Sequence, residues 1–70
     1  MGSIMRYQLD FHTLSIAVRL YVNARDAEAR RIFLGAIRHL LETAGVDLLV
    51  VEGYLIERER ASVTITRVEP

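Results

Sequence analysis

Apolar and polar residues alternate along the first third of the chain. Up to Phe11 the apolar side chains fall mainly on odd positions, and over residues 14–22 they fall mainly on even positions. A period of two residues is typical of a β-strand with one buried face. The change of parity near His12-Thr13 is what a β-bulge or a bend produces. We therefore expect one long bulged strand over residues 4–22, with two separate strands as the alternative.

A helical pattern follows over residues 24–44. Asn23 is a favourable N-cap residue, Asp26 is placed to complete a box-like cap, and Gly45 is placed to end the helix. The apolar residues of this segment cover an arc of about 200°, whereas a surface helix needs an arc of roughly 100°. Because one sheet should not cover so wide an arc, we expect its flank to contact a partner. That flank consists of Leu34, Ile37 and Leu41.

Two further strands are predicted in the last third of the chain. Residues 48–51 are four consecutive apolar residues, which place apolar side chains on both faces of a strand. Residues 61–68 alternate and are rich in β-branched side chains, which favours the last strand. We place a bulge at Gly53 and a hairpin tip at residues 57–60. The alternative is a two-residue turn at Glu52-Gly53 followed by one long strand.

The predicted order of elements is therefore β-α-β-β, in a single α+β domain of two layers over residues 1–70. One long helix packs on a bent, mainly antiparallel three-stranded sheet, and a right-handed crossover makes the first two strands parallel. This order is similar to that of dodecins and of the dimeric domain of the cell-division topological specificity factor. Both families use such units in oligomers. The resemblance lies in the order of elements alone and implies no role for any residue.

The length of the chain creates a demand for additional stabilisation. A domain of 70 residues buries only a little over half of its unfolded surface, and small domains usually add disulfides, a metal or a partner chain. The sequence has no Cys and only two His, which excludes disulfides and thiolate metal sites. We expect no metal and no cofactor. We expect a homodimer or a higher symmetric oligomer, with another protein as the alternative partner.

The charge balance narrows the range of partners. Nine Arg and no Lys stand against nine Asp and Glu, so we expect neither nucleic acid nor an anionic membrane as a partner. The longest apolar run has four residues, whereas about 20 are needed to span a bilayer. The first residues lack the apolar core of a signal peptide, so we expect a cytoplasmic protein. Residues 1–3 precede a second methionine and are interpreted as a remnant of cloning.

The sequence contains no arrangement that predicts catalysis. Asp10 and His12 are spaced to share the polar face of a strand, as in the orienting half of a catalytic triad, but no nucleophile accompanies them. His39 and Glu42 share a helix face without the second imidazole that a metal site would require. We predict that the protein is not an enzyme.

The leading hypothesis is a non-catalytic, homo-oligomeric interaction module, acting as a regulator, adaptor or scaffold and assembled through the apolar outer face of the sheet. A second hypothesis is a small-molecule binding protein whose apolar pocket forms between subunits and is lined by Tyr21 and Tyr54. A third is a designed protein without a biological role, which the absence of Lys and the regular capping favour. The predicted interface residues are Ala17, Tyr21, Leu34, Ile37, Leu41, Leu49, Val51 and Leu55.

Overall fold

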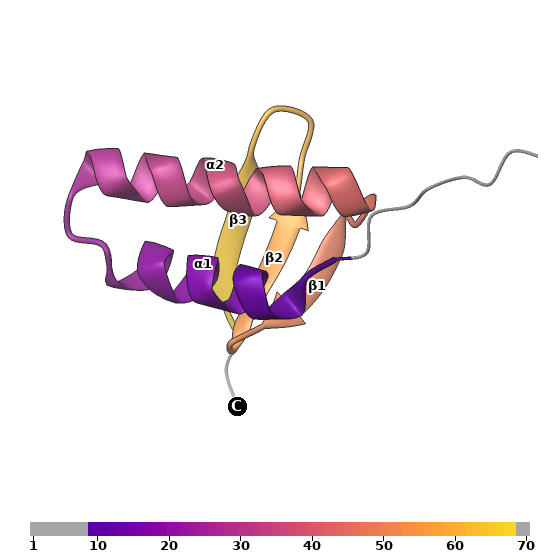
Figure 1. The fold of residues 1–70 in the computed structure, drawn as a ribbon, viewed down its shortest axis with the longest axis horizontal. Helices are drawn as coiled ribbons and strands as arrows, with labels where there is room; N and C mark the ends of the chain where they lie inside the picture. The colour runs from indigo at the N-terminus through magenta and orange to yellow at the C-terminus, as the bar shows by residue number, and fades with distance from the viewer. Residues whose placement is uncertain (1–8, 69–70) are drawn as a thin grey trace, which may run out of the picture.

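A computed structural model describes residues 9–68, in which two helices precede a three-stranded sheet (Figure 1). The two helices lie side by side in one layer, and the strands cross them in a second layer. The sheet is an antiparallel meander in the order β1-β2-β3. The expected α+β class is confirmed. The sheet has the expected number of strands, but all of them lie within residues 48–67 and both pairings are antiparallel. The elements are α1 (Phe11–Asn23), α2 (Ala27–Ala44), β1 (Leu48–Val51), β2 (Tyr54–Arg58) and β3 (Val63–Arg67).

Helix α1 replaces most of the long strand that the alternation predicted, so the β-α-β-β order is wrong. Residues 4–8 of that predicted strand lie outside the described residues. The predicted bulge at His12-Thr13 is instead the first turn of α1, where Asp10 Oδ1 accepts from His12 N at 3.1 Å and Thr13 N at 3.2 Å. No crossover joins parallel strands among residues 9–68. The similarity in element order to dodecins and the topological specificity factor therefore does not hold.

Helix α2 agrees closely with the predicted helix, except at its start. Its N-cap is Asp26, and Asn23 is instead the last residue of α1. Its end follows the prediction, because Gly45 has a φ of 70°. Gly45 N donates to Glu42 O at 3.1 Å, and Val46 N donates to Leu41 O at 2.9 Å. This pair of bonds is a Schellman motif, which satisfies carbonyls that the end of a helix leaves free.

The sheet uses both of the turns that were considered as alternatives. Glu52 and Gly53 have φ values of 55° and 77° and form a two-residue turn between β1 and β2. Positive φ at both positions gives the chain the twist that tight hairpins favour. A second turn follows β2, where Glu59 N donates to Ser62 O at 2.8 Å. The predicted bulge at Gly53 is wrong, and so is the single long strand after it.

The core lies between the two helices and one face of the sheet. Each helix contributes two fully buried side chains, and Ile56 of the central strand is also fully buried. Complete burial of such a side chain is worth about 1.5–3 kcal/mol. Among the described residues this core is small for a chain of 70 residues. Its members are Leu14, Ala17, Val18, Ile37, Leu41, Ile56 and Val63.

Candidate functional site

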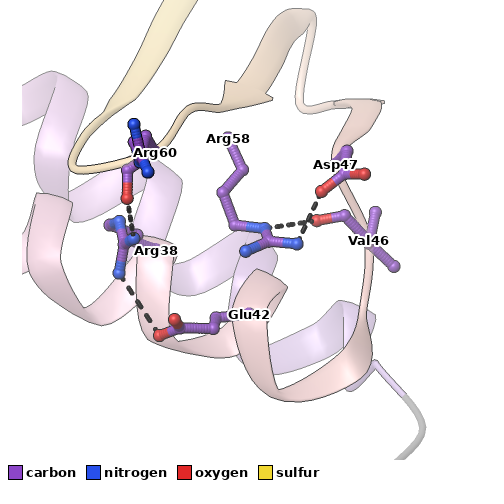
Figure 2. A network of polar contacts seen from close by, with 6 residues as sticks. All are labelled: Arg38, Glu42, Val46, Asp47, Arg58 and Arg60. Atoms are coloured by element: carbon purple, nitrogen blue, oxygen red, sulfur yellow. Dashed lines mark hydrogen bonds and ion pairs between the residues drawn. The ribbon is translucent and has the colours of Figure 1, made fainter.

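Two arginines form the main polar network and connect α2 and the loop after it to the sheet (Figure 2). Arg38 Nη1 donates to Glu42 Oε1 at 3.2 Å, and Arg38 Nη2 donates to Arg60 O at 2.7 Å. Arg58 Nε donates to Val46 O at 3.1 Å. These bonds hold the β2–β3 loop against α2, and the end of β2 against the α2–β1 loop.

The geometry of this network explains its role as a structural brace. Arg58 Nη2 lies 2.5 Å from Asp47 Oδ1, and Arg38 is paired with Glu42 one turn along its own helix. Each guanidinium is thus neutralised by a carboxylate and bonded to a backbone carbonyl. Such partly exposed pairs contribute about 0–1 kcal/mol each. Neither arginine has the free charge that a substrate anion would need.

Asp10 and His12 do not form a catalytic pair, because Asp10 caps α1. The carboxylate accepts from Thr13 Oγ1 at 2.7 Å as well as from the two backbone N–H groups. The hydrogen bond from the Thr13 hydroxyl, followed by those from the backbone, lowers the pKa of Asp10 from its usual value. Both oxygens of the carboxylate thus accept hydrogen bonds from the first turn of the helix.

A second carboxylate, Glu52, connects the β1–β2 turn to α1. Its Oε2 accepts a hydrogen bond from Ser15 Oγ, and its Oε1 lies 4.0 Å from Arg19 Nε. A residue other than glycine with positive φ is uncommon and strained, so these contacts help to hold Glu52 in its conformation. These contacts connect the turn to α1 and stabilise it.

Neither a metal-binding cluster nor a membrane-spanning helix is found within residues 9–68. Within this part of the chain, no group of three His, Asp or Glu side chains is close enough together to hold a metal ion. No helix in the same range is long and apolar enough to cross a membrane.

The outer face of the sheet, on the side away from the helices, is divided into an apolar and a polar half. Leu48 and Val50 of β1 are each 57% exposed, and Leu55 of β2 lies opposite Val50. Toward the β3 edge of the same face, the exposed residues are Glu57 of β2, which lies opposite Leu48, and Thr64 and Thr66 of β3. We call Leu48, Val50 and Leu55 the β1 patch. It joins two highly exposed apolar side chains to a half-buried one on a continuous sheet.

A second apolar surface lies on the solvent side of α1. Ile16 and Leu20 are 42% and 46% exposed and border a shallow depression of about 260 Å³, together with Arg19 and Asn23. These side chains project from α1 opposite its buried residues, so the helix is apolar on both sides. Another depression of about 200 Å³ lies between α2 and the β2–β3 loop.

The structure places all but one of the predicted interface residues in or against the core between the helices and the sheet. Ile37 and Leu41 are fully buried and Ala17 is nearly so, so the single chain leaves them almost no surface for a partner. The wide arc of α2 is explained by its contacts with α1 as well as the sheet. Only Leu55 lies on the outer face. The others are partly buried against the core: Tyr21, Leu34, Leu49 and Val51.

The predicted pocket residues Tyr21 and Tyr54 also pack against the core. The guanidinium carbon of Arg30 lies 5.8 Å from the ring centroid of Tyr21, a cation–π arrangement. Neither tyrosine lines the two depressions described above. A pocket between subunits stays a prediction.

Sequence reasoning missed Leu48 and Val50 because it assigned the wrong parity to β1. The two-residue turn pairs Val51 with Tyr54 and Leu49 with Ile56, so odd positions of β1 share a face with even positions of β2. The signal was present at Glu52-Gly53, since a glycine in a short polar break between apolar runs favours a tight turn. With that turn in place, Leu48 and Val50 share the outer face with Leu55.

Comparisons of this chain with models of protein families, with curated protein sequences and with solved structures gave no match.

Proposed function

We propose that the protein is a non-catalytic interaction module that associates with further copies of itself through the β1 patch. The exposure of Leu48 and Val50 is the observation that supports this proposal best. Contiguous apolar patches on soluble domains often mark sites of association. Here the patch lies on a regular strand, where neighbouring side chains are held in a fixed arrangement.

The chemistry of the described residues favours an interaction role over catalysis. The two arginine pairs brace the fold, Asp10 caps a helix, and Glu52 holds a turn. Each of these polar groups has a structural task. The apolar side chains of the β1 patch have none in the single chain, because they face away from the core.

The size of the core also favours association. Removing Leu48 and Val50 from water would contribute roughly 25 cal/mol for each Å² of apolar surface buried. A standard interface buries about 800 Å² per partner, so the β1 patch would be the centre of a larger contact. Oligomerisation is one of the ways in which small domains without disulfides gain stability.

Sedimentation velocity over a range of micromolar concentrations tests the proposal. We expect the wild-type chain to sediment as a dimer or larger symmetric assembly, and Val50→Glu to sediment as a folded monomer. A charge buried without a partner in an apolar contact is costly. Thr64→Glu places the same charge on the polar half of the same face, opposite Glu57. It should lower the stability slightly, because like charges then lie opposite one another, and leave the assembly unchanged.

A wild-type chain that remains monomeric throughout this range would contradict the proposal. Equal loss of association in Val50→Glu and Thr64→Glu would show that overall charge, and not the β1 patch, controls the assembly.

A further inference from the structure

The hydrogen-bond pattern of β1 determines which of its backbone groups remain available. In an antiparallel pair, residues alternate between those that exchange two hydrogen bonds with the opposite residue and those that exchange none. Arg58 N donates to Asp47 O at 2.8 Å, so Asp47 belongs to the bonded set. By alternation, Leu49 and Val51 are the β1 residues that bond to β2.

The peptide groups of Leu48 and Val50 therefore point away from β2. β1 is the outermost strand on this side of the sheet, and no other strand within residues 9–68 pairs with that edge. Two N–H and two C=O groups are thus left without a strand partner among residues 9–68, along a strand of four apolar residues. Natural sheets usually protect such an edge with a charge, a proline or a bulge, and β1 has none of these.

From this geometry we infer that two copies pair antiparallel along β1, with Leu49 opposite its own equivalent at the twofold axis; this inference rests on the proposed self-association. In this register Leu48 lies opposite the partner's Val50, and Val50 lies opposite the partner's Leu48. Each of these pairs exchanges two hydrogen bonds, so all the free groups of Leu48 and Val50 are used. The result is a continuous six-stranded sheet with an isologous interface.

The neighbouring residues exclude the two adjacent symmetric registers. A shift in one direction would pair Val50 with Val46, whose N–H already donates to Leu41 O at 2.9 Å and whose carbonyl accepts from Arg58 Nε at 3.1 Å. A shift in the other direction would pair Leu48 with Glu52, which has a φ of 55° and has left the extended conformation. The register centred on Leu49 avoids both.

The side chains of this arrangement are compatible with a copy of the same strand. No charged residue of β1 faces its equivalent, because the strand carries no charge. The β1 patches of the two copies become neighbours on the outer face and form one apolar surface across the twofold axis. A second copy thus satisfies both the backbone and the side chains of β1.

A proline substitution separates backbone pairing from simple apolar contact. Val50→Pro removes an N–H that is not used in the single chain and leaves the bonded β1 positions intact. We expect at least about a tenfold weaker dimer, with an unchanged far-UV circular dichroism spectrum. Val50→Ile keeps the N–H and the apolar side chain and should dimerise like wild type.

Disulfide trapping tests the register directly, because the wild-type chain has no cysteine. Leu49→Cys should oxidise to a covalent dimer, since Cα atoms of an unbonded antiparallel pair are about 4.5 Å apart and disulfides accept about 4.4–6.8 Å. Leu48→Cys alone and Val50→Cys alone should not, because their equivalents would be separated by about 8 Å. An equimolar mixture of these two variants should cross-link, and it probes the outer face without altering Leu49.

The outcomes distinguish pairing along β1 from self-association through another surface. Cross-linking of Leu49→Cys and of the mixture, with neither single outer-face variant cross-linked, supports the register. A wild-type dimer whose Leu49→Cys and mixed variants do not cross-link, or whose Val50→Pro variant dimerises normally, would overturn the inference and leave self-association through another surface. A wild-type monomer would remove the proposed function and the inference together.

Discussion

The two edge strands of the sheet, β1 and β3, show how one fold can have one protected and one unprotected edge. Both strands pair with β2 and both pack their inner side chains toward the helices. On the outer face, however, β1 exposes Leu48 and Val50, whereas β3 exposes Thr64 and Thr66. β3 also ends at Arg67, and β1 carries no charge.

This difference bears on the kind of assembly that can form. Threonine hydroxyl groups hydrogen-bond to water, and a charge at an edge opposes the approach of another strand. A chain with one unprotected edge strand forms a closed twofold dimer, whereas a chain with two unprotected edge strands can continue into a fibre. The polar residues of β3 therefore limit the size of the assembly, just as the apolar residues of β1 favour its formation.

The largest expected effect comes from removing the support that both edges share. Ile56 is fully buried in the central strand and lies between Leu49 of β1 and Ile65 of β3. We expect Ile56→Ala to lower the free energy of unfolding by about 2–5 kcal/mol, because it leaves a cavity in a small core. Chemical denaturation measures this change. Leu55→Ala, one residue away on the outer face, should cost clearly less, and equal losses would contradict the assignment of faces.

Replacing the outer-face threonines of β3 with apolar residues, like those of β1, should allow dimers to associate further. In the double variant Thr64→Val, Thr66→Val, β3 presents apolar side chains on the outer face as β1 does, and Glu57 of β2 remains as the charged residue between them. We expect association beyond the dimer to strengthen at least about tenfold, equivalent to about 1.4 kcal/mol, and light scattering at increasing concentration would detect it. The matched variant Thr64→Ser, Thr66→Ser keeps the hydroxyl groups and should behave like wild type. If the valine variant keeps the wild-type mass, the threonines do not limit the assembly.

A smaller effect is expected at the turn that joins β1 to β2. Ser15→Ala removes the hydrogen bond that holds Glu52 in its left-handed conformation. Loss of one such bond should lower the free energy of unfolding by about 0.5–1.5 kcal/mol. Glu52→Gly loses the same bond but relieves the backbone strain, so it should be less destabilising than Ser15→Ala. The reverse order, measured by thermal denaturation, would show that the strain is unimportant.

The smallest effect is a dependence of stability on pH at the start of α1, the helix that contacts β1. Because the folded pKa of Asp10 is lowered, its contribution is fully present above the unfolded pKa of about 3.9. That contribution is lost as the pH falls through the lower, folded value. Asp10→Asn should therefore flatten the stability profile slightly in this acidic window. A profile identical to wild type would mean that the cap does not depend on the charge.

The different compositions of α1 and α2 explain why α2 was predicted from the sequence and α1 was not. α2 has five charged residues, so its apolar residues form a pattern with a clear helical period, and Gly45 marks its end. α1 has Arg19 as its one charged residue, and eight of its thirteen residues are apolar. An apolar segment of this kind fits a period of two and a period of 3.6 equally well. Asp10 was the distinguishing signal, because it is a favourable N-cap residue.

The candidate surface was predicted only in general terms. The expectation of an apolar outer face on a small sheet was reasonable from residues 48–51, yet the chosen residues Leu49 and Val51 face the core side. Parity in a hairpin depends on the number of residues in the turn, and a shift of one residue exchanges the two faces. The sequence could not show that α1 would cover α2, which accounts for the burial of Ile37 and Leu41.

Amide hydrogen exchange of β1, measured by NMR at several protein concentrations, shows directly whether two copies pair along this strand. The amides of Leu49 and Val51 should be protected at every concentration, because they bond to β2. The amides of Leu48 and Val50 should exchange rapidly in dilute samples and become protected as the dimer forms. Rapid exchange of Leu48 and Val50 in concentrated samples, or protection that does not depend on concentration, would contradict pairing between copies along β1.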